Sequence, residues 1–245
     1  MSSALIYCMM PIPKVAPSIL FPRFSPRSFD SRIALAHKLA VESTKEDFKG
    51  KTENRLIGRF QVDVIDKQGQ LLATGKSPIA DLFTNNFGYI LGGLFAASIA
   101  NVDYTFTGCK DITNAAASFI IYYSGSGGYS LGFYNAGSGA KGLQLGVGSG
   151  VTAPARTDYN LQTILGAWTA VTNTTDLYSN STYQVITTCS ITLAAGGTVN
   201  EAGAALILSN PSGTTKTIMV AHDVISPAVV VPAGAAAIPS WTVQT

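Results

Sequence analysis

Two histidines are the first residues to examine for chemistry, because imidazole changes its charge near neutral pH. They are His37 and His222, and His222 is followed directly by Asp223. A histidine and an aspartate can form two parts of a catalytic triad. Neighbouring residues in a strand point to opposite faces, however, so Asp223 is poorly placed to orient this imidazole. We also expect no nucleophile elbow of the G-x-S-x-G kind, and hence no catalytic role for His222. His37 falls in a charged helical segment and is expected at the surface.

A glycine-rich stretch is the second feature with a chemical meaning. Gly137-Ser138-Gly139-Ala140-Lys141-Gly142 matches the dinucleotide-binding spacing G-x-G-x-x-G. That site needs the glycines to open a helix whose amides meet a pyrophosphate. Here the following residues, 143–146, have the pattern of a strand, and no serine or threonine follows Lys141 as in a P-loop. We expect the match to be fortuitous and the chain to bind no cofactor.

Carboxylates are sparse in the rest of the chain. Two of them could still come together from separate loops as a glycosidase-like pair, since spacing in sequence does not exclude it. Asp158 follows Pro154 and Arg156, a setting that favours a role in a turn or cap. The carboxylates beyond residue 67 are Asp81, Asp103, Asp111, Asp158, Asp176, Glu201 and Asp223.

The three cysteines predict neither a disulfide framework nor a metal site. Cys8, Cys109 and Cys189 are odd in number, far apart and in no metal-ligand spacing. Cys189 lies in a β-rich run, where a small buried apolar residue is the simplest interpretation. We therefore expect no catalytic, cofactor-binding or metal-binding residue in this chain.

The composition is rich in apolar residues and poor in charge. Hydrophobic residues make up 47% and charged residues 12% of the 245 positions, whereas soluble domains carry about a quarter charged residues. Residues 1–67 hold eleven basic and seven acidic side chains, a net charge of +4. No cluster of lysine and arginine is dense enough to predict nucleic-acid binding. A surface covered by neighbouring subunits would explain the shortage of charge.

The first hundred residues predict an extended arm, two helices and a hairpin. Residues 1–30 contain five prolines, which favour extended backbone. Residues 31–48 have helical composition, and residues 59–66 alternate so that Arg59, Gln61 and Asp63 form a wet face. Ser77-Pro78 is a suitable start for an apolar helix. Membrane insertion is not expected, although the uncharged residues 82–100 leave a spanning helix as an alternative.

Beyond residue 103, short apolar runs alternate with turn residues. This pattern is typical of a mainly β, antiparallel sandwich, with a jelly roll as one form. We divide the chain into an arm (1–30), a helix, hairpin and apolar helix (31–102), and a β-sandwich (103–245). The expected strands are Ala117–Tyr123, Tyr129–Tyr134, Leu143–Val147, Trp168–Thr172, Tyr183–Leu193, Ala204–Leu208, Thr217–His222, Ala228–Val231 and Ser240–Gln244.

Three stretches resemble virion structural proteins of tailed phages and related prokaryotic viruses. One is residues 60–69 with the aromatic helix around Phe83-Thr84-Asn85-Asn86-Phe87, and another is residues 145–154, ending Thr-Ala-Pro, with Asp158 and Leu161 after it. The third is residues 198–203, containing Glu201-Ala202-Gly203, followed by residues 219–224 and 230–234. Ala204 stands where a bulkier apolar residue is usual in that family, and His222 where arginine is common. The stretches cover a quarter to a third of the chain.

The resemblance implies a virion component of capsid, vertex, collar or tail that self-assembles. Its expected location is the virion, and its partners are copies of itself and other virion proteins. The alternatives are a spike or adhesion protein that binds a host-surface glycan or receptor, and an extracellular filament subunit. Aromatics such as Tyr122, Tyr123 and Phe133 could line a sugar-binding surface, although core packing is their commoner use. We do not expect an enzyme.

Overall fold

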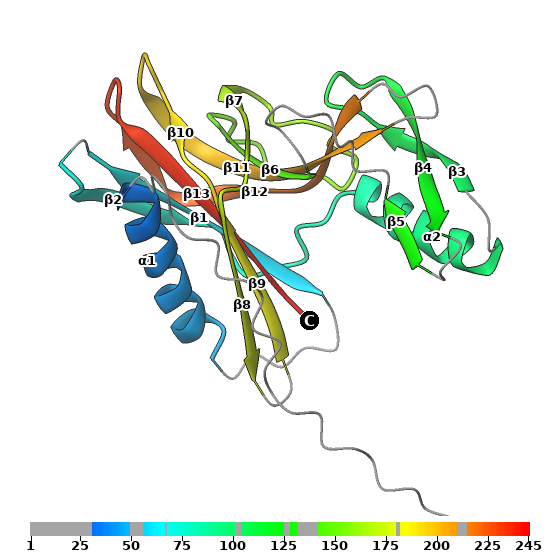
Figure 1. The fold of residues 1–245 in the computed structure, drawn as a ribbon. Helices are drawn as coiled ribbons and strands as arrows, with labels where there is room; N and C mark the ends of the chain where they lie inside the picture. The colour runs from blue at the N-terminus through cyan, green and yellow to red at the C-terminus, as the bar shows by residue number, and fades with distance from the viewer. Residues whose placement is uncertain are drawn as a thin grey trace, which may run out of the picture.

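The computed structural model describes residues 31–49, 56–66, 68–100, 104–124, 128–131, 142–179, 182–209 and 215–245. The expected arm of residues 1–30 and the glycine motif up to Lys141 lie outside these ranges. The described residues form a mainly antiparallel β structure with two helices, which confirms the predicted fold class (Figure 1). The elements are α1 (Ser31–Asp47), β1 (Ile57–Ile65), β2 (Leu71–Lys76), α2 (Asn85–Ala100), β3 (Tyr104–Lys110), β4 (Ala116–Ser124), β5 (Gly128–Leu131), β6 (Gly142–Gly148), β7 (Ile164–Ala170), β8 (Asn173–Ser179), β9 (Thr182–Thr188), β10 (Ile191–Thr192), β11 (Gly197–Ser209), β12 (Thr215–Val231) and β13 (Ala236–Gln244).

The large sheet is curled into two layers. Its strand order is β7-β6-β11-β12-β2-β1-β13-β9-β8, and β10 also pairs with β13. The strands β12 and β2 are joined by a single bridge, Ser226 with Lys76, and the sheet folds over at this weak link. At the other side, only residues 171 and 172 separate β7 from β8, so the chain itself crosses between the layers. This order shows a curled antiparallel sandwich and does not establish a jelly roll.

The centre of the sandwich draws on both halves of the chain. The strand β1 pairs with β13 along its whole length, from Ile57 with Gln244 to Ile65 with Ala236. The expected boundary near residue 102 therefore does not separate the hairpin from the sandwich. Phe60, Val62 and Val64 project from β1 into the core and are completely buried. Burying a side chain of this size stabilises the fold by about 1.5–3 kcal/mol.

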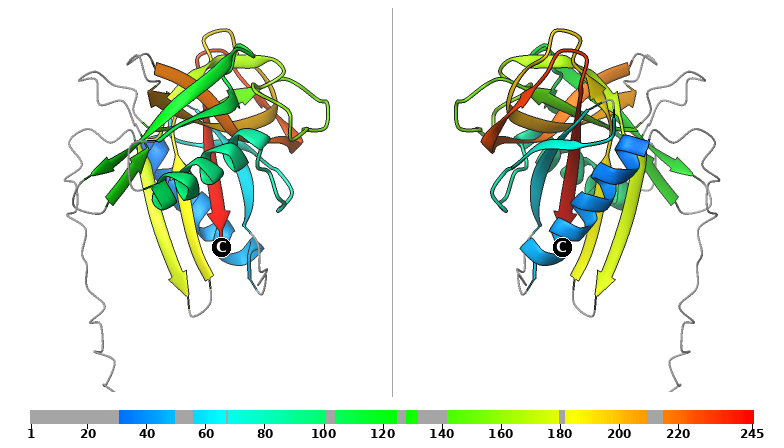
Figure 2. Two further views of the ribbon diagram at one scale, coloured as in Figure 1. Left: turned by 90° about the vertical axis from the view of Figure 1, so that its right-hand side faces the viewer. Right: turned by 90° about the vertical axis from the view of Figure 1, so that its left-hand side faces the viewer.

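The helix α1 covers the outer face of the layer that contains β1 and β13 (Figure 2). Ala36 packs there against Ile65 and Ile238. The expectation of a wet face on β1 was therefore wrong: Arg59 and Gln61 are 3% exposed and Asp63 is fully buried. Strand alternation shows that two faces differ in polarity, but not that a helix covers the polar one.

A carboxylate at the end of α1 compensates the buried arginine. Asp47 forms ion pairs with Arg59 and with Lys76, the latter at 2.7 Å, and accepts a hydrogen bond from Ser43. Burial acts to raise the pKa of Asp47, but hydrogen bonds from Lys76, Ser43 and Arg59 outweigh it and lower the pKa to about 2. The helix is thus fastened to β1 and β2 by charge as well as by apolar packing.

The second helix begins later than expected. It starts at Asn85 and not at Ser77-Pro78, because residues 78–84 lie along the sandwich: the amide of Ala80 donates to Gly58, and that of Thr84 to Val220. Neither described helix has both the length and the apolar character that crossing a membrane requires.

The helix α2 packs with β3, β4 and β5 at one end of the molecule (Figure 1). The side chain of Asn86 anchors it by donating to the backbone oxygens of Lys110 and Met219 and accepting from the Lys110 amide at 2.9 Å. An ion pair between Lys216 and Asp111, at 2.7 Å, holds the same unit to β12. The small sheet is thereby fixed to the long β11–β12 hairpin.

Replacing Asp47 with asparagine should lower the free energy of unfolding by about 3 kcal/mol. The change removes the only ion-pair partner described for the nearly buried Arg59 guanidinium and leaves only the more distant charge of Asp63, which is costly. Urea unfolding followed by circular dichroism measures the loss. The exposed neighbour Glu46 supplies the control, since Glu46→Gln should change stability by less than about 0.5 kcal/mol. Equal effects of the two substitutions would contradict this role of Asp47.

Candidate functional site

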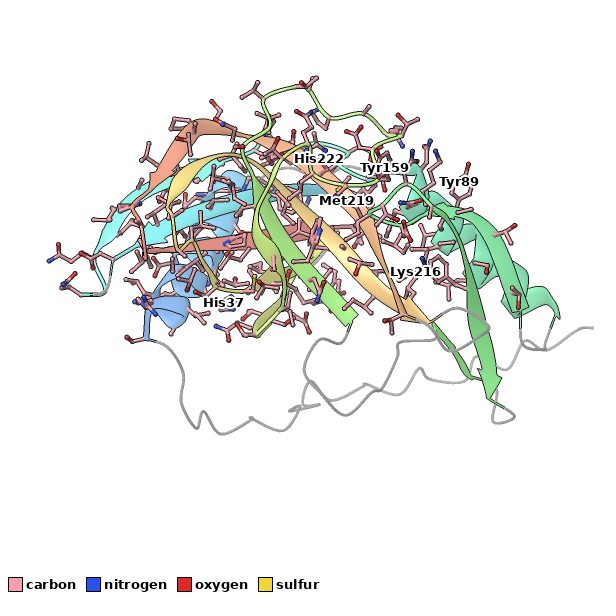
Figure 3. All side chains as sticks on the ribbon, turned by 90° about the horizontal axis from the view of Figure 1, so that it is seen from above. His37, Tyr89, Tyr159, Lys216, Met219 and His222 are labelled. Atoms are coloured by element: carbon pink, nitrogen blue, oxygen red, sulfur yellow. The ribbon has the colours of Figure 1, made fainter. Side chains whose placement is uncertain are left out.

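One group of titratable side chains joins the buried Glu201 and His222 to Asp158, whose side chain is 27% exposed. Glu201 comes from β11, His222 from the facing strand β12, and Asp158 from the loop of residues 149–163 between β6 and β7. His222 Nε2 lies 2.8 Å from Glu201 Oε2, and His222 Nδ1 lies 3.2 Å from Asp158 Oδ2. Figure 3 shows His222 close to Tyr159 and well apart from His37. Only the imidazolium form can donate to both carboxylates at once.

Glu201 is the centre of this cluster. Its carboxylate is fully buried, and each oxygen has two partners. Oε1 accepts from the amides of Gly150 and Thr163, both at 3.0 Å, and Oε2 accepts from the amide of Gln162 at 3.1 Å and from His222. Burial acts to raise the pKa of Glu201, but the hydrogen bonds from His222 and these three amides outweigh it, and the pKa is lowered.

Glycines in the β6 segment make room for this carboxylate. A Cβ atom at Gly148 would collide with Glu201 Oε1, and one at Gly150 would lie 2.7 Å from the same oxygen. Any larger residue at these two positions would push the carboxylate away from its donors. Gly148 and Gly150 are therefore explained by the close approach of Glu201, whereas a Cβ atom at Gly146 would meet the ring of Trp168.

The cluster holds the loop of residues 149–163 against the β11–β12 hairpin. Asp158 also accepts the amide of Ala155 at 2.7 Å, so the expected turn role is present. The side chain of Asn200 donates to the Ser149 carbonyl at 3.0 Å. Bonds from β11 thus reach both ends of the loop, the bond from His222 on β12 reaches Asp158 within it, and the arrangement acts as a structural clamp.

As expected, Asp223 does not orient the imidazole of His222. Asp223 accepts the amide of Val224 at 2.7 Å, while Glu201 and Asp158 bond the imidazole. Burial raises the pKa of Asp223, against weaker opposing hydrogen bonds. In the described part of the chain, no hydroxyl or thiol is hydrogen-bonded to His222. The imidazole is 1% exposed and forms one wall of a cavity of about 170 Å³.

The G-x-S-x-G spacing does occur, contrary to expectation, at Gly128-Tyr129-Ser130-Leu131-Gly132. Its first four residues form β5, which pairs with β4. A nucleophile elbow needs a sharp turn from a strand into a helix. The motif therefore lacks the geometry that would activate its serine.

The other residues singled out in the sequence have surroundings that indicate a structural role. His37 is half-buried rather than on the surface, and its ring nitrogens lie 2.8 Å from Thr188 Oγ1 and 2.7 Å from Thr175 Oγ1. Burial lowers its pKa. Cys189 is fully buried, as predicted, and burial raises the pKa of its thiol to about 12. Within the described ranges, no three histidine, cysteine or acidic side chains are placed to hold a metal ion.

The sequence singled out His222 and Asp158 but missed that Glu201 joins them. One available signal was the isolation of Glu201, the only charged residue between Asp176 and Lys216. A lone carboxylate within an apolar strand is seldom buried without a partner. The identity of that partner depends on the pairing of β11 with β12, where Gly203 lies opposite His222.

No family model, curated protein or solved structure matches this chain.

Replacing Glu201 with glutamine should lower the free energy of unfolding by about 3 kcal/mol or more. The new amide group would face backbone donors and could not replace every hydrogen bond that the carboxylate accepts from these amides and from His222. Hydrogen exchange should show faster exchange of the amides of Gly150, Gln162 and Thr163. The matched control is Asp176→Asn on the edge strand β8, which should leave both quantities nearly unchanged. Normal protection of the loop in the Glu201 variant would refute the clamp.

The effect of Glu201→Gln should also shrink in acid. A carboxylate whose pKa is lowered by folding stabilises the fold above its unfolded pKa, and this contribution disappears as pH falls through the folded pKa. Protonated glutamic acid resembles glutamine, so the stabilities of wild type and variant should converge as the pH falls below the ordinary glutamic acid pKa of about 4.3 and through the lowered pKa of Glu201. Urea unfolding at a series of pH values measures the difference. A difference that is independent of pH would show that Glu201 is not charged in the folded state.

Proposed function

We propose that this chain is a structural protein of a virus particle that works by assembling with copies of itself. The observation that carries the proposal is that the strands at the two ends of the large sheet are paired on one side and carry almost no charge. Within the described strands, β7 pairs only with β6, and β8 only with β9. The two edge strands together contain a single charge, Asp176, and no proline. Soluble monomers usually protect such edges with charges, prolines or a covering segment.

The surface near these edges is partly apolar. Ile164 on β7 is 37% exposed and Tyr178 on β8 is 81% exposed. Addition of a strand from a neighbouring copy would satisfy the open backbone groups and cover these side chains. Burial of apolar area contributes about 25 cal/mol per Å² before the costs of association.

The buried cluster is consistent with a non-catalytic role. Its carboxylates and imidazole satisfy one another, and a catalytic histidine needs contact with a substrate or nucleophile. The stretches that resemble virion proteins meet at this cluster: Glu201 and His222 belong to one, and Gly150 and Asp158 to another. Arginine, which is common in that family where His222 stands here, could also bridge two carboxylates.

A second candidate is glycan binding by a spike protein. It is favoured by a cavity of about 200 Å³ beside α2, lined by Tyr89, Tyr159, Asn85 and Lys110. Tyr89 is 48% exposed. An aromatic face beside amide and charged groups suits a sugar ring, which has apolar faces and polar edges.

Light scattering and electron microscopy of the full chain test the proposal. We expect assemblies of regular size, and their shape separates shells or rings from the filaments of an extracellular subunit. A monomer that persists at high concentration would refute the assembly role. Selective binding on a glycan array, lost in Tyr89→Ala but kept in the control Tyr178→Ala, would favour the spike instead.

A further inference from the structure

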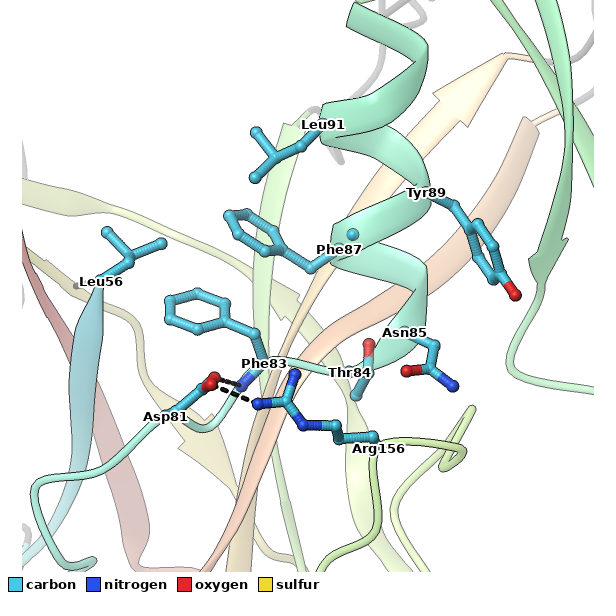
Figure 4. Close-up of a pocket in the computed structure, with 10 residues that line it drawn as sticks. Leu56, Asp81, Phe83, Thr84, Asn85, Phe87, Tyr89, Leu91 and Arg156 are labelled. Atoms are coloured by element: carbon cyan, nitrogen blue, oxygen red, sulfur yellow. Dashed lines mark hydrogen bonds and ion pairs between the residues drawn. The ribbon is translucent and has the colours of Figure 1, made fainter. Parts of the chain in front are cut away.

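A hollow of about 590 Å³ lies where α2 leaves the sandwich (Figure 4). One side is apolar: Leu56, Phe83, Phe87 and Leu91 project toward the same space. The rings of Phe83 and Phe87 are stacked, with centroids 4.4 Å apart. Leu91 is 37% exposed. Exposing such a surface is unfavourable, so it is a candidate for a binding partner.

The polar rim of the hollow is electrically balanced. Asp81 and Arg156 form an ion pair with each other, and Asp81 also accepts the amide of Phe83 at 3.3 Å. Their charges are therefore not free to select an ionic ligand. The chemistry of the hollow fits a neutral, apolar segment of chain.

Residues 1–30 have the composition of such a segment. Sixteen of the thirty residues are apolar, five more are proline, and only four are charged. A solvated tail has the reverse composition, with few apolar residues and many charges. Prolines favour the extended conformation that binds in aromatic-lined grooves. Leu20 and Phe21, preceding Pro22, are suitable anchors for the hollow.

The length of this segment allows it to reach a neighbouring copy. Thirty extended residues span up to about 100 Å, whereas a compact chain of this size has a diameter of about 45 Å. The segment leads into α1, which lies on the outer face of the layer opposite the α2 end of the molecule (Figure 1). It is therefore long enough to leave its own copy and reach another.

We propose that residues 1–30 of one copy occupy the hollow between Leu56, Phe83, Phe87 and Leu91 of a neighbouring copy. This inference rests on the proposed function, because it names the contact that joins assembling subunits. Binding in the hollow would remove the apolar side chains of the arm from water and place them against aromatic and aliphatic side chains.

Photo-cross-linking in the full chain tests this contact. The photoreactive residue p-benzoylphenylalanine is placed at position 91, and chains with light and heavy nitrogen isotopes are mixed before assembly. Mass spectrometry should find peptides from residues 1–30 joined to position 91, in pairs that combine one light and one heavy chain. The control carries the same residue at position 72, where Leu72 is 49% exposed on β2 and away from both sheet ends. We expect about tenfold less capture of residues 1–30 there, a difference of about 1.4 kcal/mol in occupancy.

Each outcome decides the question. Pairs exclusively of a single isotope would show that the segment binds its own copy, and products without residues 1–30 would show another occupant; both overturn the inference. Light scattering on the same samples separates this result from the proposed function. Assemblies of normal size without the cross-link would refute the docking alone, and chains that never assemble would refute both. Leu91→Glu is a second variant: it should weaken assembly relative to Leu72→Glu, a matched change at an exposed leucine of β2, if the hollow is occupied.

Discussion

The packing of one loop and two strands depends on a single buried carboxylate. Removing a carboxylate from water costs several kcal/mol, and Glu201 recovers this cost through His222 and three backbone amides. Those donors come from segments far apart in sequence, so the carboxylate can be satisfied only when all of them are in place. The requirement is strict because an incompletely bonded charge is more costly than none. Glu201 therefore specifies one arrangement of the loop and hairpin.

This dependence explains a pattern that resembles a catalytic site. A histidine between two acids has the residue types of a triad, yet each ring nitrogen is used to hold a carboxylate of the clamp. Chemistry needs a group that can leave its partners and meet a substrate. A side chain that is 1% exposed and bonded on both sides does not meet that condition. The same residue types can serve stability or catalysis, and their accessibility separates the two.

The local sequence pattern predicted much of the fold. The predictions that failed did so because they depended on contacts between distant parts of the chain. The helix of residues 31–48 and most strands were predicted because the spacing of apolar residues can be recognised within a short stretch of sequence. β12 was expected as two strands, because Ser226-Pro227 interrupts the pattern, but it continues from Thr215 to Val231. The polar face of β1 was misread because its cover, α1, is not a neighbour in the sheet. Glu201 was named for its motif, but its four donors come from the loop of residues 149–163 and from β12, which no local rule connects.

The buried charges of the clamp, and of the contact between Asp47 and Arg59, change how the composition should be understood. Charged side chains are already scarce, and at least five of the thirty are buried: Arg59, Asp63, Asp111, Glu201 and Asp223. Buried charges stabilise specific contacts but contribute nothing to the hydration of the surface. The exterior is therefore poorer in charge than the 12% suggests, and glycine, serine, threonine and asparagine must supply most of its polarity. Net charge and charged surfaces are what keep monomers apart. Several of the few charges in this chain are buried, and the two strands at the sheet ends carry one charge or none. Such a surface is physically suited to contact other subunits.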